Sequence, residues 1–220
     1  MSIRVRAITV TVLIFAAMTY LFAWSPVFSV RTISVTGAPH EVSEKYLISK
    51  SKIFIGEKLS RIEPRSIERS LGEISWVKSV AVDRNWLKGD VIMTITSRVP
   101  VGIYLGKAID NSGTLFELPG ENPRGLPVVS AGTPALGLEA ISLFTNLPID
   151  IRNATLSVSA SNENSISSWQ EVTGRKVKVM WGSSKDLDLK VTVLKALLAL
   201  PENSSIRRVD LSAPHAPIVK

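Results

Sequence analysis

An uncharged, mostly apolar run from Ala7 to Trp24 opens the chain. At about 1.5 Å of helical rise per residue, this run reaches about 27 Å, which is close to the thickness of the hydrocarbon core of a bilayer. Its aliphatic and aromatic side chains favour insertion, and Tyr20 and Trp24 at the far end are residue types enriched at membrane interfaces. The pattern therefore predicts a transmembrane helix over residues 7–24.

The charges beside this run predict its orientation. Arg4 and Arg6 are the side-chain charges that precede it, and cationic flanks stay on the cytoplasmic side. We therefore expect residues 1–6 to form a short cytoplasmic tail and residues 25–220 to lie across the membrane. A cleaved signal peptide is the alternative, but the bulky residues around Ala23 do not match a small-residue cleavage site and favour an uncleaved anchor.

The next seventy residues predict a first module of strand, helix, helix, strand and strand over residues 28–98. Alternating apolar positions indicate the strands, apolar spacing of three and four residues indicates the helices, and Gly89 lies in the turn between the last two strands. The predicted elements are a strand over 28–35, a helix around 46–48, a helix from Pro64 to Gly72, and strands over 77–85 and 91–97.

Residues 99–212 predict a second module that is richer in strands. A hairpin turn is expected at Asp110–Gly113, and Thr133–Pro134 is a helix start signal. The predicted strands cover 101–109, 114–116, 156–158, 176–181 and 206–211. The predicted helices cover 134–144, 165–174 and 186–200, and residues 213–220 are a tail. In the helix over 186–200, Lys190 and Lys195 are expected to face away from the apolar stripe.

These elements together indicate an α+β chain. It combines one N-terminal transmembrane helix, a β-α-α-β-β module and a mostly antiparallel sheet flanked by helices. The chain has 220 residues, and the length after the membrane run suits either one large domain or two small ones, each with a core of its own; we favour two.

The composition and the motifs of the chain argue against catalysis, metal binding and nucleic-acid binding. The chain has no cysteine, so it offers no disulfide, thiolate nucleophile or cysteine-bound metal. The formal charge of +7 is spread along the sequence rather than gathered in a nucleic-acid-binding stripe. The two histidines, His40 and His215, follow prolines in predicted loops, and no phosphate loop, nucleophile elbow or dinucleotide motif is present. We expect no enzyme activity, no metal, no cofactor, no small-molecule substrate and no nucleic-acid partner.

Several motifs in a fixed order resemble the FtsQ/DivIB family of cell-division proteins. The first module, with Val30–Gly37 and Ile74–Trp86, is similar to the POTRA module of that family. The junction Arg98–Gly102 and the hairpin Ile109–Phe116 resemble the start of its β domain, and Val209–Pro214 resembles its last strand in actinobacterial members. The chain departs from the family pattern at Ser97, where an acidic residue is usual, and at Leu87, where proline is usual.

The resemblance implies a non-enzymatic scaffold of the division machinery. Such a protein lies in the plasma membrane at the septum, binds the bitopic proteins FtsB (DivIC in Gram-positive bacteria) and FtsL, and through them influences FtsW and FtsI. It also implies that a partner strand pairs with the edge of the carboxy-terminal sheet. A terminal strand with no following element would leave backbone groups unpaired for such a partner.

The candidate partner-binding residues are therefore those of the last predicted strand. They are Arg207, Arg208, Val209, Asp210, Leu211 and Ser212. We expect Val209 and Leu211 to face the core, while Arg207 and Arg208 face solvent. Trp76 and Trp86 are interpreted as packing residues of the first module rather than ligand sites.

Two other classes of function stay open from the sequence. A membrane-tethered cell-wall enzyme would need a cleft with titratable side chains, for which the sequence offers no candidate set. A POTRA-bearing envelope assembly or secretion factor would need a membrane barrel or several tandem modules, and the 220 residues contain neither pattern.

Overall fold

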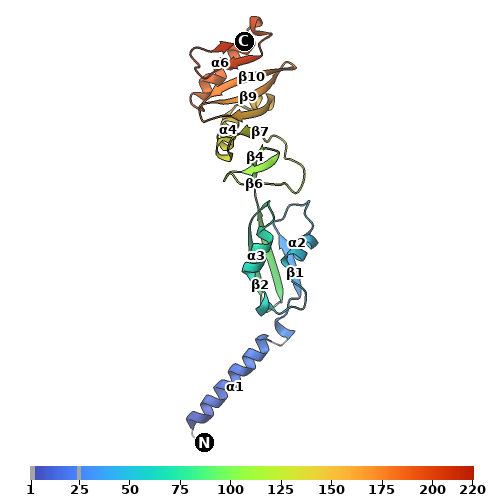
Figure 1. Cartoon of the computed structure of the whole chain (residues 1–220). Helices are drawn as coiled ribbons and strands as arrows, with labels where there is room; N and C mark the ends of the chain where they lie inside the picture. The colour runs from blue at the N-terminus through green and yellow to red at the C-terminus, as the bar shows by residue number, and fades with distance from the viewer. Residues whose placement is uncertain (1–2, 24–25) are drawn as a thin grey trace. The chain divides into compact units, whose positions relative to one another are not determined.

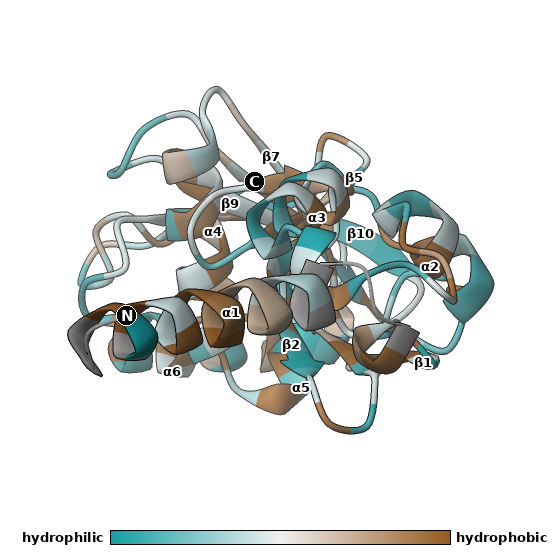
Figure 2. Ribbon diagram, turned by 90° about the horizontal axis from the view of Figure 1, so that it is seen from below, coloured by the Kyte–Doolittle hydropathy of each residue, from teal (hydrophilic) through white to brown (hydrophobic). Residues whose placement is uncertain are grey.

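The N-terminal helix α1 runs from Ile3 to Ala23 in a computed structural model that describes residues 3–23 and 26–220 (Figure 1). Hydrophobic residues occupy most of its length (Figure 2). The hydroxyl groups of Thr9 and Thr19 donate to backbone carbonyls one turn earlier, at 2.9 and 2.8 Å. No helix within residues 3–23 and 26–220 combines the length and the apolar character needed to cross a membrane. The predicted interfacial residue Trp24 lies outside the described residues.

The chain divides between Arg98 and Val99 into two compact units. The first unit contains, after α1, a small three-stranded sheet in the order β1-β3-β2, with β1 parallel and β2 antiparallel to β3. Its elements are η1 (Pro26–Phe28), β1 (Thr32–Thr36), α2 (Glu44–Ser51), η2 (Leu59–Arg61), α3 (Pro64–Gly72), β2 (Val77–Asn85) and β3 (Asp90–Ser97). The predicted β-α-α-β-β order is confirmed.

Helices α2 and α3 supply the apolar side chains that the sheet of the first unit buries. Leu47 and Leu71 from the helices are fully buried, as are Val91 and Met93 from β3. The alternation along β3 therefore has a direct cause, because every second residue meets the helices. Trp76 is also buried, as a packing residue should be.

The second unit contains a sheet of nine strands among the described residues, in the order β12-β11-β10-β9-β8-β7-β4-β5-β6. Its elements are β4 (Pro100–Tyr104), β5 (Lys107–Asp110), β6 (Leu115–Phe116), β7 (Val128–Ala131), α4 (Pro134–Asn146), α5 (Ile149–Ala154), β8 (Thr155–Ala160), β9 (Ile166–Val172), β10 (Arg175–Gly182), α6 (Leu187–Ala199), η3 (Pro201–Asn203), β11 (Arg208–Asp210) and β12 (Ile218–Val219).

This sheet is mixed. The pairs β4–β7, β7–β8 and β10–β11 are parallel, while the pairs β4–β5, β5–β6, β8–β9, β9–β10 and β11–β12 are antiparallel. The α+β class is confirmed, and five of the eight strand pairs described in this sheet are antiparallel, but the three parallel pairs were not predicted. Apolar alternation along one strand does not reveal the direction of its neighbour.

One row of side chains crosses the sheet on the face that the helices cover. Each member pairs with the next in the strand register, and the row passes from β7 to β12. Its members are Val129, Val158, Ser168, Val179, Val209 and Val219. Ile141 and Phe144 of α4, Ile151 of α5 and Leu194 of α6 belong to the same buried cluster. The row therefore sets the face on which the core of the second unit forms.

Strand β9 corrects the prediction of a short helix over 165–174. Ile166, Trp169 and Val172 have helical spacing in the sequence, but Ile166, Ser168 and Gln170 are the residues that are buried. The core-facing set therefore has period two, and two of its members are polar. Ser168 is accommodated because its hydroxyl accepts the indole N–H of the fully buried Trp181 at 2.9 Å.

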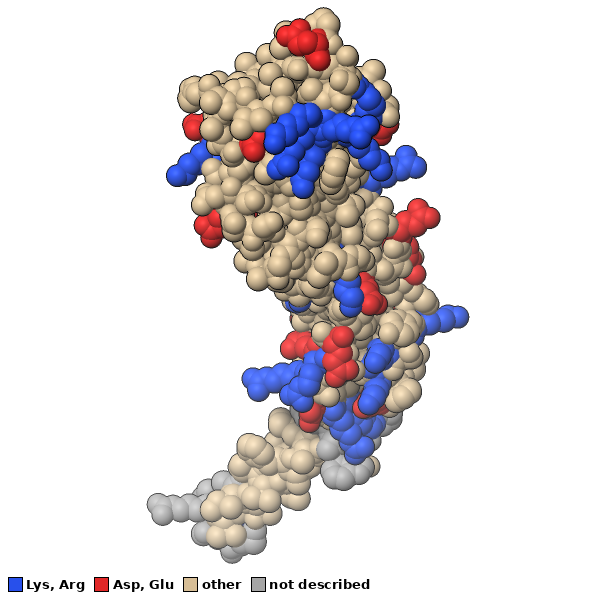
Figure 3. Space-filling view, turned by 45° about the horizontal axis from the view of Figure 1, so that its top comes forward, with Lys and Arg blue, Asp and Glu red and all other residues tan. Residues whose placement is uncertain are grey.

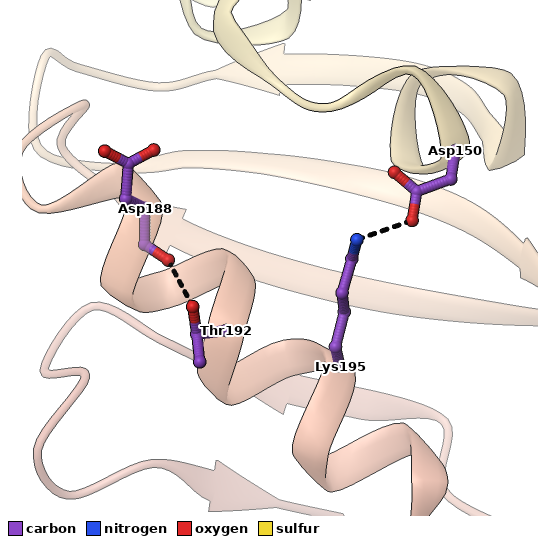
Figure 4. A network of polar contacts seen from close by, with 4 residues as sticks. All are labelled: Asp150, Asp188, Thr192 and Lys195. Carbon is purple, nitrogen blue, oxygen red and sulfur yellow. Dashed lines mark hydrogen bonds and ion pairs between the residues drawn. The ribbon is translucent and has the colours of Figure 1, made fainter.

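Helix α6 corrects a second prediction. Lys195 faces solvent and pairs with Asp150 at 2.7 Å (Figure 4), but Lys190 is buried, with 2% of its surface exposed. The Lys190 ammonium donates to the carbonyl of Ser183 at 2.7 Å. Burial lowers the pKa of Lys190, while the charge of Asp186 acts in the opposite direction. Lys190 thus ties the start of α6 to the segment that follows β10.

We predict that Ser168→Ala lowers the free energy of unfolding by about 1–3 kcal/mol, because it leaves the buried indole N–H of Trp181 unpaired. Ser167→Ala is the matched control, since this hydroxyl pairs with Ser159 at 3.0 Å on the half-buried opposite face. Its effect should stay within about 0.5 kcal/mol. Urea unfolding of both variants measures the difference, and equal losses would contradict the assigned role of Ser168.

We also predict that Lys190→Ala lowers the free energy of unfolding by about 2 kcal/mol or more. The substitution removes buried methylene groups and leaves the Ser183 carbonyl without its donor. Lys195→Ala on the same helix removes an exposed ion pair and should cost less than about 1 kcal/mol. The two values come from the same denaturation experiment. A larger loss for Lys195→Ala would contradict the burial of Lys190.

Candidate partner-binding edge

The six predicted partner-binding residues lie on β11 and at its two ends. β11 runs parallel to β10, with Arg208 opposite Lys178 and Val209 opposite Val179. The amide of Lys178 donates to the carbonyl of Arg207 at 2.8 Å, and the amide of Leu211 donates to the carbonyl of Met180 at 2.7 Å. One side of β11 is therefore fully engaged with the sheet.

The other side of β11 is engaged as well, so the prediction that it forms the free edge is wrong. The chain turns after Ser212 and returns as β12, which pairs antiparallel with β11. Arg208 and Lys220 exchange two backbone hydrogen bonds of 3.0 and 2.9 Å. Pro214 and Pro217 favour the prediction of a tail over residues 213–220. Ile218 and Val219 beyond them are β-branched, however, and extend the sheet by one strand.

The side chains of β11 are buried on one face and exposed on the other, as predicted. Val209 and Leu211 are fully buried in the core cluster. Arg207 and Arg208 are exposed, and Ser212 is exposed at the end of the strand. The carboxylate of Asp210 accepts the amide and the hydroxyl of Ser212, at 3.0 and 2.6 Å, and so fixes the turn that leads away from β11.

Two cations, the exposed Arg208 and the half-buried Lys178, and an aromatic ring occupy the opposite face of the sheet beside β11. Lys and Arg side chains gather on one face of the second unit (Figure 3). The guanidinium of Arg208 contacts the sulfur of Met180, with Nε at 3.1 Å. The ammonium of Lys178 lies 5.8 Å from the ring centre of Trp169, which is 42% exposed. This face can attract acidic segments.

The free edge of the sheet at this end is the outer side of β12. In an antiparallel pair, alternate residues direct their backbone groups toward the neighbour. Because Lys220 bonds to Arg208, the intervening residue Val219 directs its N–H and C=O away from β11. Ile218 is 56% exposed beside it. This edge is short, and Pro217 offers a carbonyl but no donor.

Metal chemistry finds no support at this site. Within the described residues, no group of three or more His, Cys, Asp or Glu side chains is placed to hold a metal ion. His40 and His215 are both exposed. The residues that sequence reasoning missed are Ile218 and Val219, and their β-branched side chains were the one signal that could have indicated a further strand.

Two family models together match nearly all of the chain that follows α1. The model described as "POTRA domain, FtsQ-type" matches residues 28–96. The model described as "Cell division protein FtsQ/DivIB, C-terminal" matches residues 103–212, which includes β11 but ends before β12.

Three curated relatives carry the description "Cell division protein FtsQ". The protein of Streptomyces bingchenggensis is 31% identical over 230 aligned residues, which cover 95% of this chain and 82% of the relative. That of Corynebacterium glutamicum is 29% identical over 64% of this chain and 60% of its own length. That of Salinibacter ruber is 23% identical over 56% of this chain and 47% of its own length. The resemblance found in the sequence is thus confirmed, and the chain belongs to the FtsQ/DivIB family of cell division proteins.

Proposed function

We propose that the chain is a non-enzymatic scaffold of the septal division machinery. It is held in the plasma membrane by its N-terminal helix, with the N-terminus in the cytoplasm and residues 26–220 outside. It binds FtsB/DivIC-like and FtsL-like bitopic proteins and influences FtsW and FtsI through them. The observation that carries the proposal is the outward-directed backbone of Val219 at the end of a sheet in a member of the FtsQ/DivIB family.

Strand addition beside β12 is the binding mode that this edge favours. An extended segment placed there meets the N–H and C=O of Val219 and the C=O of Pro217. Each neutral hydrogen bond contributes about 1 kcal/mol, so this edge alone gives modest affinity. The partner therefore also needs side-chain contacts, for which the exposed Ile218 offers an apolar neighbour.

The six residues first singled out support this edge in different ways. Val209 and Leu211 are buried and hold β11 in place, and β11 in turn positions β12. Arg207 and Arg208 add exposed positive charge near the edge, which favours a partner segment with acidic residues. Asp210 and Ser212 fix the turn between the two strands.

The membrane anchor has its own support. Apolar side chains along α1, among them Leu13 at 63% and Phe15 at 70%, are exposed. The hydrogen bonds of Thr9 and Thr19 to the helix backbone leave these hydroxyls satisfied without water, as a lipid environment requires. The uncharged run continues to Trp24 in the sequence. A helix with these properties is stable when lipid surrounds it.

We predict that Val219→Pro weakens binding to the soluble ectodomain of the cognate FtsB/DivIC-like protein by about tenfold or more. The substitution removes the outward donor and places a ring at the edge, while the bonds between Arg208 and Lys220 stay in place. Val219→Ala is the matched control, because it loses the same packing but keeps the N–H. Titration calorimetry measures both affinities.

Unfolding curves show whether both variants keep a folded second unit. A folded Val219→Pro protein that binds as tightly as Val219→Ala would contradict strand addition at β12. Substitutions at Val209 or Leu211 are unsuitable for this test, because both side chains are fully buried and their loss would disturb the core.

A further inference from the structure

One end of the first unit lies close in the chain to α1. Ser29 follows Ala23, the last residue of α1, by six residues. Six residues of extended chain span at most about 20 Å. Whatever surrounds the C-terminal end of α1 is therefore within reach of the part of the first unit that contacts Ser29.

Two loops of the first unit are hydrogen-bonded to the backbone of Val30 and Arg31. The loop 53–57 is held by Val30, whose carbonyl accepts the amide of Gly56 and whose amide donates to the carbonyl of Glu57, both at 2.8 Å. The turn between β2 and β3 is held by Arg31, whose amide donates to the carbonyl of Gly89 at 2.7 Å. These contacts fix both loops beside residues 29–31.

The approach at Gly89 is close enough to require glycine. Its φ is +78°, and a Cβ there would lie 2.6 Å from the carbonyl oxygen of Ser29. The turn between β2 and β3 can therefore lie this close to Ser29 only with glycine at position 89.

Both loops expose large apolar side chains. The exposed fractions are 70% for Phe54, 72% for Ile55 and 87% for Leu87. Their neighbours Ile53 and Leu59 are buried in the core, so the loop 53–57 divides its apolar residues between the interior and the outside. Leaving three such side chains in water forgoes the favourable free energy of their burial. Exposed apolar groups that gather at one place mark a contact surface.

Exposed cations lie close in the chain to these apolar side chains or to the residues that hold their loops. Arg31, Lys52 and Lys88 are exposed in the same segments. The acidic residues there are Glu57, whose carboxylate accepts the amide of Phe54 at 3.3 Å, and Asp90. The combination of apolar tips and nearby cations fits the headgroup layer of an anionic bilayer.

We propose that this surface, defined by Phe54, Ile55 and Leu87 with Arg31, Lys52 and Lys88, rests on the anionic lipid headgroup layer next to α1. The proposal relies on the membrane anchor proposed above. It adds that the first unit has a fixed side toward the membrane rather than swinging freely on its connection. The short chain between Ala23 and Ser29 is what makes lipid the favoured occupant.

The absence of cysteine from the sequence makes a site-directed test clean. The full-length chain is prepared as Ile55→Cys and Leu87→Cys, spin-labelled and reconstituted into vesicles that contain phosphatidylglycerol. Collisions of each label with oxygen, which concentrates in lipid, and with a water-soluble nickel complex report its surroundings. Leu105→Cys in the second unit is the exposed control, at 69% exposure, and Val12→Cys in α1 is the lipid control.

We expect the ratio of oxygen to nickel collisions at positions 55 and 87 to exceed that at position 105 severalfold and to approach that at position 12. The double variant Arg31→Glu, Lys88→Glu should lower the ratio at positions 55 and 87 toward the value at position 105, because anionic lipid then repels this side of the unit.

Each contrary result has a distinct meaning. Labels at 55 and 87 that match position 105, while position 12 stays lipid-protected, would overturn the headgroup surface and leave the anchor intact. A water-exposed label at position 12 would overturn the anchor and the surface together. Protection at 55 and 87 that disappears on dilution of protein in the vesicles would identify a second copy as the occupant and also overturn the proposal. Binding to FtsB/DivIC-like protein is read separately by the Val219→Pro titration.

Discussion

The arrangement of the second unit depends on β11, a strand of three residues that is hydrogen-bonded on both sides. The fully buried side chains of Val209 and Leu211 hold it against the core, so its backbone is fixed relative to the helices. Because β11 is fixed, the two residues of β12 can pair with it although so short a strand has little stability of its own. The free edge of the sheet is thus β12, one strand beyond β11, which the sequence predicts as the edge.

The position of the free edge at β12 bears on how the proposed scaffold would bind a partner strand. Backbone donors and acceptors at a sheet edge recognise any extended segment, so specificity has to come from the side chains around the edge. The edge at β12 is kept short by Pro217, which limits pairing with unrelated strands. The exposed Ile218 and the cations of β11 then favour a segment with an apolar residue and acidic neighbours.

Much of the first unit could be predicted from the sequence because its signals are local. Pro64 begins α3 and Gly89 lies in the turn between β2 and β3, as the sequence indicated. In the second unit, the signals that failed concern tertiary context. Ser168 is buried because Trp181 supplies a donor, and Lys190 is buried because the Ser183 carbonyl supplies an acceptor. Neither partner can be read from local periodicity, and β12 exists because β11 offers it an edge.

Amide hydrogen exchange of the second unit, with and without saturating FtsB/DivIC-like ectodomain, tests strand addition at β12 most directly. The amide of Lys220 donates to Arg208 and should be protected in both states. The amide of Val219 faces outward and should exchange rapidly in the free protein, then become strongly protected in the complex. An amide of Val219 that exchanges equally fast in the saturated complex would contradict the account.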